Sequence, residues 1–245
     1  MMYKIIIWVS VLFVGQCLGA QPLPVLKVVS EEWTNYTNAD GSGTYWDIVA
    51  AVYSKHYQLE FIATTWSRAL NLVETGHADV LVGSYKTTNR KLIFPQQHLD
   101  TEYPLYAIFD KNVQTINDDK DLAGLTIAGK KDYGFEHFLP NSSRYYGVEQ
   151  IDNTAKLIEK KRVDVVLTYR INLALADPEN RFSHQAIGAE APLYLAFTHS
   201  AKGKKLKEHY EHEVIALLSD NKLKQYFPNA REYQHAQLDS LLVTP

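Results

Sequence analysis

The stretch Trp66–Arg90, WSRALNLVETGHADVLVGSYKTTNR, constrains the fold more than any other part of this 245-residue chain. Leu70 and Val73 lie three residues apart, a spacing that predicts an amphipathic helix with one buried face. Gly76 follows and can adopt the left-handed backbone that ends a helix at low cost, because it has no Cβ. The apolar run 80–82 then predicts a short buried strand, after which the sequence becomes polar. This order of helix, glycine, strand and polar loop is typical of an α/β unit.

The same order occurs a second time in the chain. Segment 72–83, LVETGHADVLVG, aligns without gaps onto segment 157–168, LIEKKRVDVVLT. Two copies are too few for a solenoid, which stacks several repeats. They fit two α/β lobes, each with a loop just past the C-terminal end of a strand, where open parallel sheets bind ligands. A plainer explanation stays open, because buried strands are generally rich in Val and Leu and make α/β units look alike.

The first twenty residues, MMYKIIIWVSVLFVGQCLGA, have the layout of a cleavable secretory signal. Lys4 precedes the apolar run 5–14, which is shorter than the roughly 20 residues that span a bilayer. We therefore expect an exported protein, cleaved after Ala20. Lipid anchoring at Cys17 is disfavoured, because Gln16 stands where lipobox processing prefers a small residue.

Composition excludes several kinds of chemistry. Cys17 is the single cysteine and would leave with the signal, which removes thiol catalysis and thiolate metal sites. A net charge of −3, with acids and bases interspersed, favours neither nucleic acid nor an anionic membrane as a partner. His209 and His212 lie one helical turn apart among many charged residues, which is typical of a solvated face, and we expect no metal. No phosphate loop or dinucleotide fingerprint is present, so we expect no cofactor.

Strand and helix patterns alternate along the chain, which predicts parallel sheets. The remaining expected elements are strands at 25–29, 59–62, 125–128 and 163–167, and helices at 47–57, 204–218 and 221–227. Two similar extended segments, 103–109 and 191–197, are expected to carry the chain to a second lobe and back. The expected divisions are a signal at 1–20, the first part of lobe 1 at 21–103, lobe 2 at 104–192, and the return to lobe 1 at 193–245.

Taken in order, the motifs W-x-R-A-L, G-x-x-D-V-L-V-G, T-x-x-R, Y-P-L-Y and D-L-A-G-L-T-I resemble those of bacterial periplasmic solute-binding proteins of family 3. The resemblance runs from Val25 to about Phe227. It implies an α/β, periplasmic-binding-protein-like type II fold, with two lobes joined by two crossing strands and closing on a ligand in the cleft between them. It also implies a monomeric periplasmic receptor that delivers a small polar solute, amino-acid-like or carboxylate-bearing, to the membrane permease of an ABC importer.

The resemblance and side-chain chemistry together give candidate ligand-binding residues. Arg90 matches the arginine of T-x-x-R, which grips the ligand's α-carboxylate in that family, and a guanidinium pairs bidentately with a carboxylate. The alternative is a surface arginine paired with a nearby acid. Ser84 and Tyr85 follow the buried strand and would form the cleft wall. Trp33 and Trp66 stand where the family often places aromatic walls, although large aromatic side chains also serve simply to pack the lobes.

The second lobe departs from the amino-acid pattern. Tyr169 stands just past strand 163–167, where family members that hold an α-ammonium usually have an acid. The loop 129–134, GKKDYG, lacks the Gly-Thr-Thr run that donates to the ligand carboxylate, and Asp132 is its candidate negative charge. An aromatic, anionic or otherwise atypical solute is therefore expected in preference to a plain α-amino acid.

Two other functions fit the same fold. One is a sensor subunit that signals to a membrane receptor, since docking surfaces carry no motif that separates it from an importer subunit. The other is a small dehydratase using one cleft carboxylic acid, for which Glu31, Glu32 or Asp132 would need a raised pKa. The sequence shows no pair of acids arranged for that chemistry, so we expect no enzymatic activity.

Overall fold

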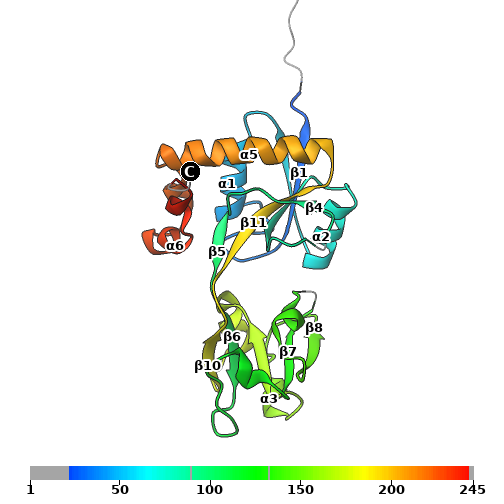
Figure 1. The fold of residues 1–245 in the computed structure, drawn as a ribbon, viewed down its shortest axis with the longest axis vertical. Coiled ribbons are helices and arrows are strands. Elements are labelled where there is room, and N and C mark those ends of the chain that lie inside the picture. The colour runs from blue at the N-terminus through cyan, green and yellow to red at the C-terminus, as the bar shows by residue number, and fades with distance from the viewer. Residues whose placement is uncertain (1–21, 89, 132, 243–245) are drawn as a thin grey trace, which may run out of the picture.

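The computed structural model describes residues 22–88, 90–131 and 133–242, and Figure 1 shows them arranged as two lobes along the long axis of the molecule. The expected signal at 1–20 and the candidate residue Asp132 lie outside the described residues. Across the described ranges, no helix combines the length and the apolar character needed to cross a membrane.

The first lobe contains a mixed sheet in the order β2-β1-β3-β11-β4, with β5 also paired to β11. Its strands are β1 (Val25–Glu31), β2 (Gln58–Thr64), β3 (Val80–Ser84), β4 (Leu92–Ile93), β5 (Asp100–Glu102) and β11 (Ala191–Thr198). Its helices are α1 (Thr44–Tyr53), α2 (Trp66–Glu74), α5 (Ala201–Ser219) and α6 (Ala230–His235), with 3-10 helices η4 (Leu223–Tyr226) and η5 (Leu238–Leu242).

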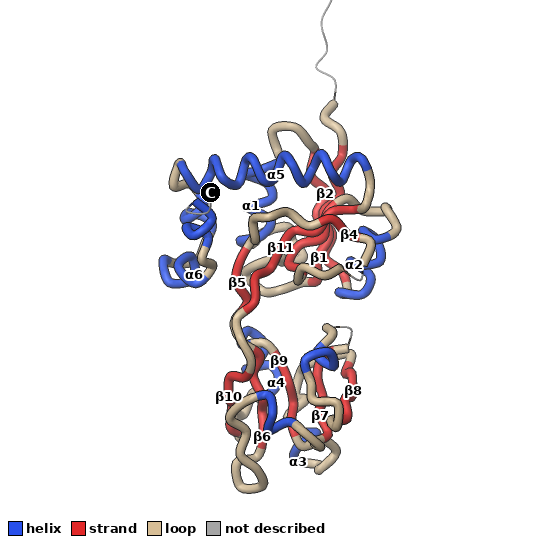
Figure 2. Tube along the Cα trace, in the orientation of Figure 1, coloured by secondary structure: helices blue, strands red, loops and turns tan. Residues whose placement is uncertain are grey.

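Both faces of this sheet are covered by helices. Val80 and Val82 pack into one core with residues of α1 and α5, whereas Leu81 packs on the opposite face against α2. All three side chains are completely buried, which explains why the strand is uniformly apolar rather than alternating. Figure 2 shows α5 lying across the first lobe on the side away from the second.

The second lobe contains a smaller sheet in the order β10-β6-β9-β7-β8. Its strands are β6 (Leu105–Phe109), β7 (Thr126–Lys130), β8 (Arg144–Val148), β9 (Val165–Thr168) and β10 (Ser183–Ile187). Its helical segments are all short: α3 (Lys156–Glu159), α4 (Leu173–Ala176), and the 3-10 helices η1 (Asp119–Leu122), η2 (Phe135–Phe138) and η3 (Arg170–Asn172).

The sequence repeat has a structural basis in two aspartates. The Asp79 carboxylate accepts a hydrogen bond from the Lys27 amide at 3.0 Å, and the Asp164 carboxylate accepts one from the Thr126 amide at 2.7 Å. Each aspartate therefore ties the start of a central strand to the neighbouring parallel strand of its own lobe. The two copies are equivalent units in the two sheets.

The chain passes between the lobes twice, through Tyr103–Pro104 and through residues 188–190. On either side of this waist the two passes are paired, because Glu102 is opposite Ala191 in one sheet and Leu105 is opposite Ile187 in the other. Segments 105–109 and 191–197 are extended as expected, but each lies within the sheet of one lobe, and the chain crosses just before each of them. The helix expected at 221–227 is shorter and more tightly wound than expected, because only residues 223–226 form a 3-10 helix.

Gly83 leaves room for the Trp33 ring at the boundary between the lobes. Its φ is +80°, and a Cβ added there would lie 2.4 Å from Cζ3 of Trp33. Gly124 has nearly the same φ, +79°, but nothing within 4 Å of an added Cβ. The two glycines therefore share the backbone requirement and differ in the close approach of a ring.

This difference gives a matched test of packing. Gly124→Ala should lower the free energy of unfolding by about 1 kcal/mol, the cost of a strained backbone. Gly83→Ala should cost about 1–3 kcal/mol more, because Trp33 must also move. Chemical denaturation measures both values, and equal losses for the two variants would show that Trp33 has room to shift.

Candidate functional site

A cavity of about 390 Å³ lies between the lobes. The first lobe contributes the loop after β1, the end of β3, strand β5 and helix α6. The second lobe contributes the loops that follow β7 and β9. The cavity thus lies past the C-terminal ends of parallel strands, as expected for a ligand site in open α/β sheets.

Indole and phenol rings form much of the cavity wall. Trp33 and Trp66 contact each other with ring centroids 5.7 Å apart, and Trp33 also meets Tyr45 edge-on at 6.5 Å. Tyr133 and Tyr169 face them from the second lobe, with ring centroids 5.7 Å apart. This wall explains the aromatic residues that the sequence places in polar loops, and it offers ring faces to a flat or cationic group.

Three hydrogen bonds that involve tyrosine hydroxyls bridge the lobes. The hydroxyls of Tyr85 and Tyr169 lie 2.8 Å apart, one donating to the other. Tyr133 donates its hydroxyl to the Glu31 carboxylate at 2.7 Å and accepts from the Trp33 indole nitrogen at 3.3 Å. Burial raises the pKa of all three tyrosines, so each hydroxyl keeps its proton and can donate.

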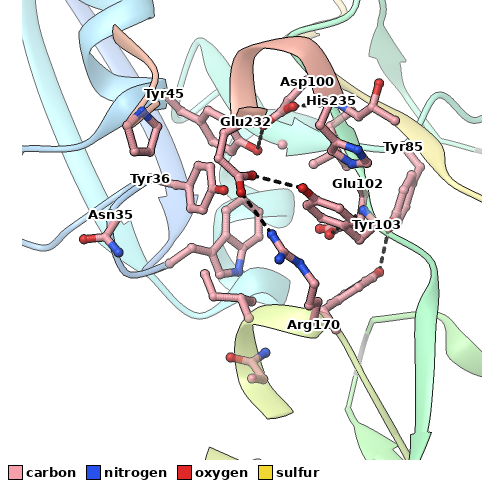
Figure 3. Close-up of a pocket in the computed structure, with 18 of the residues that line it drawn as sticks. Asn35, Tyr36, Tyr45, Tyr85, Asp100, Glu102, Tyr103, Arg170, Glu232 and His235 are labelled. Carbon is pink, nitrogen blue, oxygen red and sulfur yellow. Dashed lines mark hydrogen bonds and ion pairs between the residues drawn. The ribbon is translucent and has the colours of Figure 1, made fainter. Parts of the chain in front are cut away.

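Two ion pairs also join the lobes. Lys130 lies 3.2 Å from the Glu31 carboxylate, and Arg170 lies 3.3 Å from the Glu232 carboxylate of α6. The Arg170 guanidinium also stacks on the Tyr103 ring, 3.7 Å from its centroid, and Tyr103 donates its hydroxyl to Glu232 at 3.3 Å. Figure 3 shows Arg170 reaching across the cavity toward Glu232.

Strand β5 brings two further carboxylates to the cavity. Asp100 accepts hydrogen bonds from the Tyr45 hydroxyl at 2.8 Å and the Thr101 amide at 2.7 Å. Glu102 accepts one from the Tyr103 amide at 3.0 Å. Burial raises the pKa of Asp100 to about 6 and that of Glu102 to about 7, although these hydrogen bonds oppose the shift in each case. Both carboxyls therefore titrate near neutral pH.

The structure brings four of the sequence-derived candidates to the cavity: Trp33, Trp66, Tyr85 and Tyr169. Ser84 is instead buried in β3, where its hydroxyl donates to the Tyr85 carbonyl at 3.2 Å. Whether the four lining residues bind a ligand stays a prediction.

Arg90 lies away from this cavity. Its guanidinium pairs with Glu74 at the end of α2, 3.5 Å away, and 43% of its side chain is exposed. This is the surface arginine paired with a nearby acid that the sequence left as the alternative. Its role as a carboxylate ligand has no support from this geometry.

Sequence reasoning missed the charged residues of the cavity: Asp100, Glu102, Arg170 and Glu232. The alternation D-T-E just before Y-P-L-Y was an available signal, because it places two acids on one face of a strand that enters the crossing. In the part of the chain that the structure describes, no three His, Cys, Asp or Glu side chains are placed to hold a metal ion.

No protein-family model matches this chain, and no curated protein matches it. Solved structures do share its fold. A putative L-cystine ABC transporter protein from Listeria monocytogenes superposes with a TM-score of 0.64 at 16% identity, covering 88% of this chain and 98% of the other. An ancestral arginine-binding protein bound to glutamine gives 0.67 at 17% identity, covering 82% and 95%.

A third similar structure is an ancestral amino acid-binding protein, a precursor of cyclohexadienyl dehydratase. It gives a TM-score of 0.63 at 18% identity and covers 82% of this chain and 92% of the other. Similarities at these identities define the fold. The chain has the two-lobed, type II fold of amino-acid ABC transporter substrate-binding proteins, which confirms the fold expected from sequence.

Removing the Glu102 carboxyl should change stability with a defined pH dependence. A carboxyl whose pKa is higher in the folded state destabilises that state as the pH rises from its ordinary value of 4.5 toward about 7. Glu102→Gln should therefore be more stable than the parent protein at pH 8, by about 3 kcal/mol. Near pH 4 the two should be equally stable, because the carboxyl is protonated in both states.

Chemical denaturation at pH 4 and pH 8 measures this difference. Glu136→Gln is the control, because Glu136 is exposed on η2 and does not line the cavity. If Glu102→Gln has the parent protein's stability at pH 8, the carboxyl is not destabilised by its surroundings.

Proposed function

We propose that this protein is a periplasmic solute-binding receptor that closes its two lobes on a small polar organic ligand and delivers it to the permease of an ABC importer. One observation carries the proposal: a cavity of about 390 Å³ between the lobes, lined from both of them and bridged by hydrogen bonds and ion pairs. Cavities of 300–1,000 Å³ are typical of small-molecule sites. Trp33, Trp66, Tyr85 and Tyr169 are the proposed ligand contacts.

The comparisons and the sequence support the same proposal. The similar solved structures are substrate-binding proteins of amino-acid ABC transporters. The N-terminal segment has the layout of an export signal, which agrees with a receptor outside the cytoplasmic membrane. We expect the receptor to act as a monomer and to dock on a membrane permease.

A second candidate, a small dehydratase, rests on Asp100 and Glu102. A carboxyl that titrates near neutral pH can donate a proton to a leaving group. A similar solved structure is that of a dehydratase precursor. The two functions differ in what becomes of the ligand, because a receptor releases it unchanged.

A thermal-shift screen tests the proposed function. The chain beginning at residue 21 is heated with amino acids, amines, aromatic acids and dicarboxylates. A ligand that binds the folded state alone should raise Tm as its concentration increases. Mass spectrometry of the ligand after long incubation should recover it intact. Loss of the ligand with appearance of a dehydrated product would instead show a dehydratase. If no compound raises Tm, the receptor function is contradicted.

The bridge through Tyr133 should control lobe closure. Tyr133→Phe removes the hydroxyl that joins Glu31 and Trp33, so the ligand-free protein should populate more open arrangements and bind its ligand about fivefold more weakly. Small-angle X-ray scattering should show a larger radius of gyration without ligand and the parent value with ligand. Tyr146→Phe is the control, because Tyr146 is 59% exposed on β8. Equal scattering for both variants would show that the bridge does not restrain the lobes.

A further inference from the structure

The cavity contains more negative than positive charge. Asp100, Glu102 and Glu232 all line it, whereas Arg170 is its one lysine or arginine within the described residues. Glu232 is already paired with that arginine. Two carboxyls, those of Asp100 and Glu102, are therefore left without a cation of their own.

The groups that bond these two carboxyls are neutral. Asp100 accepts from the Tyr45 hydroxyl and the Thr101 amide, and Glu102 accepts from the Tyr103 amide. Lys130 is paired with Glu31, and neither residue lines the cavity. Burial raises the pKa of both carboxyls, and in Glu102 it outweighs the lowering by the Arg170 charge. A positive charge placed directly against them would lower the pKa further.

The aromatic rings beside these carboxyls also suit a cation. The Arg170 guanidinium lies over the Tyr103 ring, 3.7 Å from its centroid, so this part of the cavity already stabilises a cation. The His235 ring also stacks on Tyr103 at 3.5 Å, so the rings that remain for a ligand are those of its neighbours. Tyr36 and Tyr45 stand next to each other with ring centroids 4.8 Å apart, and Tyr45 is bonded to Asp100. Figure 3 shows these rings and carboxyls around one space. Carboxylates surrounded by ring faces are the surroundings that bind ammonium and guanidinium groups.

We propose that the ligand of this cavity is an organic cation, whose ammonium or guanidinium group lies against Asp100 and Glu102 and the tyrosine rings beside them. This inference rests on the proposed function, because it names the class of ligand that the same site takes. Among the aromatic, anionic or otherwise atypical solutes expected from the sequence, it disfavours an anion, since Arg90, the carboxylate partner expected there, is paired with Glu74 outside the cavity.

Matched ligands test the charge directly. Isothermal titration of the chain beginning at residue 21 compares agmatine, putrescine, lysine and arginine with citrulline, norleucine and glutamate. At least one cation should bind, and its counterpart without the side-chain charge, citrulline for arginine or norleucine for lysine, should bind about tenfold more weakly or worse. Binding of citrulline, norleucine or glutamate with no cation bound would overturn this inference and leave the receptor standing. No binding by any compound would overturn both.

Charge-changing variants then locate the cation. Glu102→Gln and Asp100→Asn should each weaken binding of the cation by about tenfold or more. Arg170→Gln should strengthen it several-fold, because it removes a competing positive charge from the cavity. Affinity changes of opposite sign in the acid and arginine variants separate charge recognition from general damage to the site. Glu136→Gln is the control for a distant surface acid. Unchanged affinity in both Glu102→Gln and Asp100→Asn would overturn the placement.

Discussion

The pairing of β5 with β11 is the contact on which the rest of the structure depends. Strand β5 is the last strand of the first lobe before the chain enters the second lobe, and β11 is the first strand after it returns. The two pair antiparallel, with Glu102 opposite Ala191. Because both passes of the chain cross at one place, the lobes can rotate about the waist without breaking either sheet. The same pairing fixes β5 beside the cavity, and with it the two acids that alternate along the strand.

Those two acids are placed at a cost to the folded protein. A raised pKa means that the folded state holds the charged carboxyl less favourably than the unfolded chain does. A glutamine or asparagine would occupy the same volume and keep the observed hydrogen bonds from neutral donors. Ion pairs elsewhere in the chain, such as Lys202 with Asp79 at 2.7 Å, show acids that do have a cation nearby. Asp100 and Glu102 have no such cation of their own, and a positive charge bound beside them would restore the stability that their burial costs.

The fold could be predicted from sequence because it depends on local periodicity. Apolar runs marked the strands, and the repeated aspartates 79 and 164 marked equivalent strand starts, since each carboxylate bonds a neighbouring strand's amide. Cavity residues that directly follow such strands, such as Trp33 and Tyr169, could be predicted in the same way. The place of Arg90 could not be predicted, because the local motif does not reveal its pairing with Glu74. Asp100 and Glu102 were missed because their burial comes from β11 and α6, some 90 to 130 residues further along the chain.

The charge of the ligand also decides between the receptor and the enzyme. A general acid must hold its proton when the substrate is bound, so Glu102 would serve a dehydratase only if its pKa stayed near 7 in the complex. A cation placed against the carboxyl lowers that pKa and drives the group to its ionised form. Binding an organic cation and donating a proton are therefore opposed uses of the same side chain. A cavity whose carboxyls recognise a positive charge cannot, with that ligand bound, supply the neutral acid that dehydration requires.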